Sequence, residues 1–223
     1  MVKPPMKDSE QAPTRGRPKK LSHARIVEAG MAMGLRDLTF VGLAGALGVT
    51  HMTLYNHIAS LEALKVAVAE AIFERWQMPP VERGDGQALP DYLIDFIASL
   101  RDLVIAHPGL TPYLLRRSVA SPTMSARIAG HQSEVAAAYA LPVEQARWLM
   151  STVAFHCIAV ADTLYAGAGK DAVPAGTRAR DASEVDREFA QGMHALALGA
   201  LQILRSGVDL QSLSLPPPAA KSG

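Results

Sequence analysis

Between Thr39 and Leu64, apolar residues recur at intervals of three and four in two short segments. The repeating apolar positions are Leu43, Ala44 and Leu47 in the first segment and Leu54, Tyr55 and Ile58 in the second. This spacing places them on one face of each of two helices, which can share a core. Gly48 follows the first segment and supplies a residue type that commonly ends helices. Two helices joined by a short turn with glycine form the helix-turn-helix pattern.

Short polar residues occupy the other face of the second segment and are expected to point outward. They are His51, Thr53, Asn56 and His57. A recognition helix contacts base edges and phosphates from such a face. A threonine methyl suits thymine, its hydroxyl donates or accepts, and asparagine can pair with adenine. The segment therefore predicts a DNA-reading element.

The remainder of the chain also has helical periodicity, and no alternating pattern predicts a strand. Ser22 can cap a helix over 23–33, which Gly34 ends, and Thr39 can cap the next. Beyond the two segments above, helices are predicted over 61–76, 90–106, 112–117, 122–139, 142–166 and 184–205. Gly42 and Gly45 inside a helix are interpreted as sites of close helix approach. The chain is predicted to be all-α, with about nine helices.

Charge is distributed unevenly, although the net charge is only +1. Residues 1–60 carry +4, and residues 61–223 carry −3. A basic run, Arg15, Arg17, Lys19 and Lys20, precedes the first helix. It is either a solvated, flexible tail or an arm that touches DNA, and its Arg-Gly-Arg-Pro core resembles an AT-hook, which places arginines in a narrow minor groove. The N-terminal part is the one expected to meet a polyanion.

Several classes of protein are disfavoured. The single cysteine, Cys157, excludes an internal disulfide and fits a reducing cytoplasm. The N-terminus lacks an apolar signal region, and the apolar run 148–161 is too short for a membrane span. No phosphate loop, nucleophile elbow or metal-ligand spacing occurs, so no enzyme activity, cofactor or metal is expected.

The run from about Leu21 to Trp76 resembles the N-terminal domain of the TetR family of bacterial transcriptional regulators. The shared pattern stands here as LAGALGV at 43–49, THM at 50–52 and TLYNH at 53–57, with the trailing leucine at Leu64. The resemblance covers about a quarter of the chain. Two features depart from the family: Leu61 replaces the usual phosphate-contacting lysine, and the first helix with its loop is about three residues short.

The resemblance implies roles for individual residues. His51 and Thr53 match residues that reach base edges, whereas Tyr55, His57 and Thr39 match residues that contact phosphates. Tyr55 and His57 could instead help to pack the helix, and Met52 is either neutral or a thymine-methyl contact. The full set of DNA-contact candidates is Arg15, Arg17, Lys19, Lys20, Thr39, Thr50, His51, Met52, Thr53, Tyr55, Asn56 and His57.

The resemblance also implies a second domain with a ligand cavity, and a homodimer formed by helices 143–166 and 184–205. The helix over 143–165 is apolar on several sides, and Gly192, Ala195 and Gly199 form a small-residue strip on the last one. Candidate cavity residues, for which ordinary core packing is the alternative, are Phe96, Leu100, Tyr113, Met124, Ile128, His131, Trp148, Phe155, His156 and Tyr165.

The predicted organisation is a disordered basic arm (1–20), a helix-turn-helix domain (21–66, linking helix to 77), a ligand-binding and dimerisation domain (78–208) and a disordered tail (209–223). The expected function is that of a cytoplasmic homodimeric repressor that binds a palindromic operator in double-stranded DNA and leaves it when a small-molecule, apolar effector binds. The alternative is a non-specific or architectural DNA-binding protein that uses the arm, without effector control. No Lys or Arg occurs between Arg36 and Lys65, so the arm should supply an unusually large share of DNA affinity.

Overall fold

The computed structural model describes residues 21–82, 86–116, 121–165 and 181–213, and within these residues the chain is helical without strands. The N-terminal helices are α1 (His23–Met33), α2 (Phe40–Leu47), α3 (His51–Tyr55) and α4 (Leu61–Arg75). The second set is α5 (Leu89–Ala106), α6 (Thr111–Leu115), α7 (Pro122–Ala138), α8 (Val143–Tyr165) and α9 (Ala182–Ser206), followed by a 3-10 turn, η2 (Leu210–Ser212). The prediction of an all-α fold with an N-terminal helix-turn-helix is confirmed.

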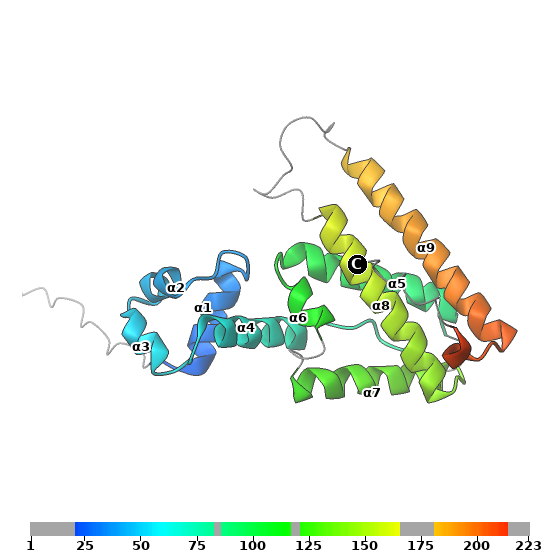
Figure 1. Ribbon diagram of the computed structural model, residues 1–223, viewed down its shortest axis with the longest axis horizontal. Helices are drawn as coiled ribbons and strands as arrows, with labels where there is room; N and C mark the ends of the chain where they lie inside the picture. Colours follow the sequence, from blue (N-terminus) through cyan, green and yellow to red (C-terminus); the bar gives the residue numbers. More distant parts are fainter. Residues whose placement is uncertain (1–20, 83–85, 117–120, 166–180, 214–223) are drawn as a thin grey trace, which may run out of the picture.

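The helices are arranged along one long axis (Figure 1). The helices α2 and α3 lie at one end, and α4 leads from that end toward the second set. At the other end α9 lies against α8 and α5, while α7 packs on α8. The linking helix α4 therefore joins the N-terminal helices to the second set of helices, where it contacts α7.

Helix boundaries follow local capping chemistry. The side chains of Ser22, Thr39, Thr50, Ser60 and Ser121 each accept a hydrogen bond from a backbone N–H in the first turn of the helix that follows. The helix α2 ends at Gly48, whose φ of 67° is in the left-handed region. These caps explain why the predicted boundaries agree with the observed ones to within about two residues.

Two hydrophobic cores form. The N-terminal core gathers buried residues of α1 to α4, and Leu103 and Leu110 from the second set of helices join it. The larger core gathers buried residues of α5, α7, α8 and α9. Because Leu103 and Leu110 pack on the N-terminal core, the last turns of α5 and the loop that follows it connect the two parts of the molecule directly.

The tightest helix approach involving a glycine of this domain occurs at Gly30, which the sequence analysis does not name. A Cβ atom at Gly30 would lie 2.7 Å from Val68 Cγ2, so α1 and α4 meet there. A Cβ at Gly45 would meet no atom within 4 Å, and one at Gly42 would meet its own N-cap residue, Thr39, and Met33. The close-approach interpretation is therefore wrong for Gly45, whereas Gly42 lies against Met33, the last residue of α1.

The helix α8 has an unusual surface for a core helix. It packs against α5, α6, α7 and α9, yet Val160 on its outer side is 37% exposed, and Phe155, which also borders a cavity, is 54% exposed. Among the described helices it alone is long and apolar enough to cross a bilayer by length and composition, with 33% of that window buried. Core helices of soluble proteins also meet this criterion.

Candidate nucleic-acid interface and internal cavity

Thr50, in the turn between α2 and α3, caps the N-terminus of α3. Thr50 Oγ1 accepts from the Thr53 backbone N–H at 3.3 Å and lies 2.9 Å from Thr53 Oγ1. Leu54 and Ile58 are 0% and 5% exposed and anchor the segment in the core. This anchoring fixes which side of α3 faces outward.

The outward side carries the residues expected there. His51, Asn56 and His57 are exposed, and Met52 is 68% exposed. Tyr55, counted in the sequence among the core positions, is 50% exposed and stacks on Phe40 with ring centroids 4.6 Å apart. The reason is that α3 ends at Tyr55, so the ring lies along α2 instead of entering the core.

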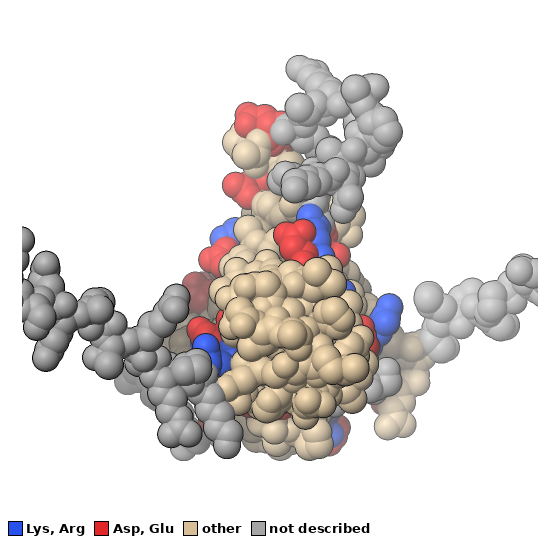
Figure 2. Space-filling model, turned by 90° about the vertical axis from the view of Figure 1, so that its left-hand side faces the viewer, with Lys and Arg blue, Asp and Glu red and all other residues tan. Residues whose placement is uncertain are grey.

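Among the described residues, the centre of this end of the molecule carries no Lys or Arg. Figure 2 views it directly and shows a broad surface of uncharged residues, with Lys and Arg only toward the margins. The sequence agrees, because Arg36 and Lys65 bound a stretch without Lys or Arg. The predicted contacts Arg15, Arg17, Lys19 and Lys20 lie outside the described residues.

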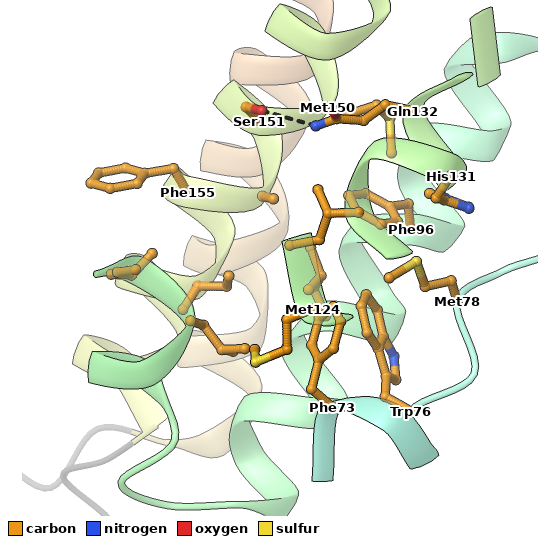
Figure 3. A pocket seen from close by; sticks show the side chains of 16 residues that line it. Phe73, Trp76, Met78, Phe96, Met124, His131, Gln132, Met150, Ser151 and Phe155 are labelled. Atoms are coloured by element: carbon orange, nitrogen blue, oxygen red, sulfur yellow. Dashed lines mark hydrogen bonds between the residues drawn. The ribbon is translucent and has the colours of Figure 1, made fainter. Parts of the chain in front are cut away.

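A cavity of about 250 Å³ lies in the second set of helices. Its walls come from the end of α4, from α5, α6 and α7, and from α8 (Figure 3). Phe73 and Trp76 of α4 line it, so the helix that carries the helix-turn-helix also forms a wall of the cavity.

His131 and its neighbours form a buried polar group at the cavity edge. His131 is 9% exposed, and its Nε2 lies 2.6 Å from the Tyr92 hydroxyl. Its Nδ1 is 3.7 Å from a Glu134 carboxylate oxygen. Burial lowers the pKa of His131, and the nearby Glu134 opposes that shift in part. Burial likewise raises the pKa of the Tyr92 hydroxyl.

Arg127 ties α7 to the end of α4. Its guanidinium donates to the backbone carbonyls of Phe73, Glu74 and Trp76 and lies 5.4 Å from the centre of the Phe73 ring. Carbonyls in the last turn of a helix lack intrahelical partners, so this side chain supplies donors that α4 needs. A second tie joins the same helices, because the Ser121 hydroxyl donates to Glu70 at 2.6 Å.

The outer faces of α8 and α9 carry exposed apolar and small residues. Leu198 of α9 is 62% exposed, and Gly192, Ala195 and Gly199 are exposed beside it in the helix. A Cβ at Gly192 or Gly199 would meet no atom within 4 Å. This strip is therefore open to a partner helix.

The whole architecture resembles solved structures of bacterial regulators. A TetR variant from Acinetobacter baumannii in complex with minocycline has a TM-score of 0.64 at 18% identity, over 85% of this chain and 100% of that one. Apo ActR from Streptomyces coelicolor has a TM-score of 0.65 at 19% identity, over 86% and 99%. BioQ from Mycobacterium smegmatis has a TM-score of 0.60 at 23% identity, over 82% and 99%. The chain has the TetR fold.

A curated relative adds a sequence match. It is an uncharacterized HTH-type transcriptional regulator of Mycobacterium tuberculosis, 34% identical over 97 residues. The match covers 42% of this chain and 44% of the relative, so the chain spans less than half of that relative's length. No protein-family model matches the chain. The relative and the solved neighbours are regulators, not enzymes.

Within the TetR fold, the predicted cavity residues divide into two groups. Those that line the cavity are Phe96, Leu100, Met124, Ile128, His131 and Phe155. The other four lie elsewhere: Trp148 and His156 face a surface groove of α8, Tyr113 approaches Glu62, and the Tyr165 hydroxyl donates to Asp186 at 2.6 Å.

Other cavity residues are not singled out by the sequence. They include Phe73, Trp76, Met78, Gln132, Met150 and Ser151. Phe73 and Trp76 are assigned by periodicity to the linking helix, and Met78 belongs to the segment after it. Gln132 follows His131 on α7, and a helical face with His131 and Ile128 could have included it.

The single cysteine, Cys157, belongs to the larger hydrophobic core. Cys157 is buried, and its S–H lies 3.4 Å from the Ile97 carbonyl. Burial raises the pKa of this thiol to about 12, which disfavours the reactive thiolate.

Proposed function

We propose that the chain is a DNA-binding transcriptional regulator that acts as a homodimer, represses by occupying a palindromic operator and is released by a small molecule. The observation that carries the proposal is the outward side of α3 and its C-cap at the end of a TetR fold, where His51 and Asn56 are exposed and Thr53 is half-buried. Those side chains offer hydroxyl, imidazole and amide groups to base edges.

We assign recognition of the DNA sequence to side chains of the α3 segment, and most of the binding affinity to other parts of the chain. His51 and Thr53 are proposed to reach base edges, Met52 a thymine methyl, and Tyr55 and His57 phosphates. Because this surface lacks Lys and Arg, it contributes little of the counterion-release free energy that dominates DNA binding. The proposal therefore gives that role to Arg15, Arg17, Lys19 and Lys20.

A dimer would supply the second half of the contacts. The open strip on α9 and the exposed apolar side of α8 support a two-fold pairing of these helices. Two recognition helices in a two-fold dimer would address half-sites about 34–36 Å apart.

The position of the cavity supports ligand control. Its wall includes Phe73 and Trp76, and Arg127 connects the same turn of α4 to α7. A ligand that moves α7 relative to α4 would change the orientation of α3, so it would favour a state with misplaced recognition helices. Of the solved neighbours, TetR has been determined with minocycline and ActR with actinorhodin.

Selection from random DNA tests the function without knowledge of the operator. The full chain is incubated with random duplexes at near-physiological salt, and retained duplexes are sequenced. The proposal predicts an enriched palindrome with half-sites about one helical turn apart. Enrichment of no motif, with retention of DNA, would favour the architectural alternative, and retention of no DNA would contradict both.

A pair of variants tests whether the Thr53 side chain recognises a base. Thr53→Ala should relax base preference at one position in each half-site and cost about 1–3 kcal/mol of discrimination. Ser133→Ala is the matched control, because that exposed hydroxyl lies on α7 and donates to the Ala129 carbonyl. Its selected motif should equal that of the parent.

A further inference from the structure

We infer that the cavity takes an uncharged, largely apolar molecule with a single hydrogen-bonding group, which the Gln132–Ser151 pair recognises. This inference rests on the proposed function only in identifying the cavity as an effector site. It defines the chemical class of ligand for that cavity.

The first support is the absence of charge in the wall. Among the described residues that line the cavity there is no Asp, Glu, Lys or Arg. The nearest charged groups of α7 are turned elsewhere: Arg127 donates to α4 carbonyls, and Glu134 is exposed. A charged ligand would lose its hydration without gaining a counter-ion, which is strongly unfavourable.

The second support is the apolar content of the wall. Three methionines, Met78, Met124 and Met150, line it with aromatic rings such as Phe73 and Phe96 (Figure 3). Methionine side chains are flexible and polarisable and make favourable contacts with aromatic groups. Such a wall adapts to flat, apolar ligands.

The third support is the distribution of hydrogen-bonding groups. The Trp76 indole N–H already donates to Ser99 at 2.8 Å, and His131 is paired with the Tyr92 hydroxyl. Gln132 Nε2 donates to Ser151 Oγ at 3.1 Å, as the dashed line in Figure 3 shows. Gln132 is 6% exposed, whereas Ser151 is exposed. Within the described residues, the Gln132 carbonyl oxygen and the Ser151 hydroxyl proton have no further protein partner. One acceptor and one donor are therefore available together.

The volume limits the ligand. An apolar cavity of roughly 150 Å³ holds benzene. The cavity here, of about 250 Å³, has room for a molecule of roughly two fused rings. It reaches the surface beside Phe155, which is 54% exposed and lies across the group of side chains from His131 (Figure 3).

The test uses probes of one size and different charge. Binding of 2-naphthol, 2-naphthoate and the cationic 1-naphthylmethylamine to the full chain is measured by calorimetry at pH 7.5. The expected result is binding of 2-naphthol at least tenfold tighter than of either ion. Equal or tighter binding of an ion would overturn the inference, as would failure of 2-naphthol to bind.

Two variants assign the binding to this cavity. Ala154→Phe fills the wall from α8 and should abolish 2-naphthol binding while retaining the DNA motif. Gln132→Met should weaken 2-naphthol several-fold but leave naphthalene, which has no hydroxyl, unchanged. If 2-naphthol binds Ala154→Phe as it binds the parent, or if Gln132→Met weakens both probes equally, the assignment fails. DNA selection is scored separately, so failure of the ligand class is distinguishable from failure of the proposed function.

Discussion

At the level of single residues, His131 is a buried histidine whose surroundings lower the pKa of its imidazole. The side chains that face it are the Tyr92 hydroxyl from α5, with Glu134 and Arg127 from its own helix. Burial is the largest influence and lowers its pKa below the ordinary value. Protonation in the folded state is therefore less favourable than in the unfolded chain.

This shift predicts a pH dependence of stability. Because the unfolded chain binds the proton more readily, the His131 contribution is fully present above about pH 6.5 and is lost as pH falls through the folded-state pKa. Urea unfolding of His131→Gln between pH 5 and 8 should show a flatter profile than the parent. His156→Gln is the control, since that exposed histidine bonds only its own helix at Thr152 and should keep the parental profile. An unchanged profile for His131→Gln would contradict the assignment.

The glycines of the N-terminal domain give a second prediction. Gly30→Ala should lower the free energy of unfolding by about 1–3 kcal/mol, because its methyl would overlap buried Val68. Gly45→Ala should raise it by about 0.5–1 kcal/mol, because that helical position has open space around it. Denaturant titration measures both, and equal effects of the two would contradict the packing.

At the scale of elements, the tie between α7 and α4 should stabilise the whole chain. Arg127→Met leaves three α4 carbonyls without their donor, which should cost on the order of 1–3 kcal/mol. Arg147→Met is the matched control on α8, where the arginine pairs with Glu144 at the surface, and its effect should stay within about 0.5 kcal/mol. Urea denaturation midpoints that are equal for both variants would show that the tie carries no free energy.

Helix positions are predictable here because caps and periodicity act locally. Ser22, Thr39 and Gly48 each mark a boundary through their own backbone or side chain. The side chains in the cavity are harder to predict, because α8 is apolar on several sides. Met150 lines the cavity and Trp148, two residues earlier, does not, and only the crossing of α8 with α5 and α7 decides between them. Phe73 and Trp76, at the end of α4, line the cavity because of long-range packing that local sequence patterns do not reveal.

At the scale of the whole molecule, the exposed strip on α9 predicts a dimer that a single charge can disrupt. Leu198→Lys should shift the chain from dimer to monomer in sedimentation velocity, because Leu198 is 62% exposed and would meet the partner strip. Val41→Lys is the control, since Val41 is 75% exposed on α2, far from α9 along the long axis. A parent chain that sediments as a monomer would contradict the pairing.

We propose that the helix-turn-helix reads DNA without cations and depends on the basic arm for affinity. Each cation that neutralises a phosphate adds about 0.9 to the slope of log affinity against log salt. This slope can be compared between variants on the same selected duplex.

The decisive measurement compares three chains: the parent, a variant with Arg15, Arg17, Lys19 and Lys20 changed to alanine, and a control with Lys3 and Lys7 changed to alanine. DNA affinity is recorded from about 50 to 200 mM salt, a range over which 6–10 phosphate contacts change affinity by about 10³–10⁵. We expect weak binding and a slope smaller by several units for the four-fold variant, with nearly parental binding by the control. Parental affinity and slope in the four-fold variant would contradict it.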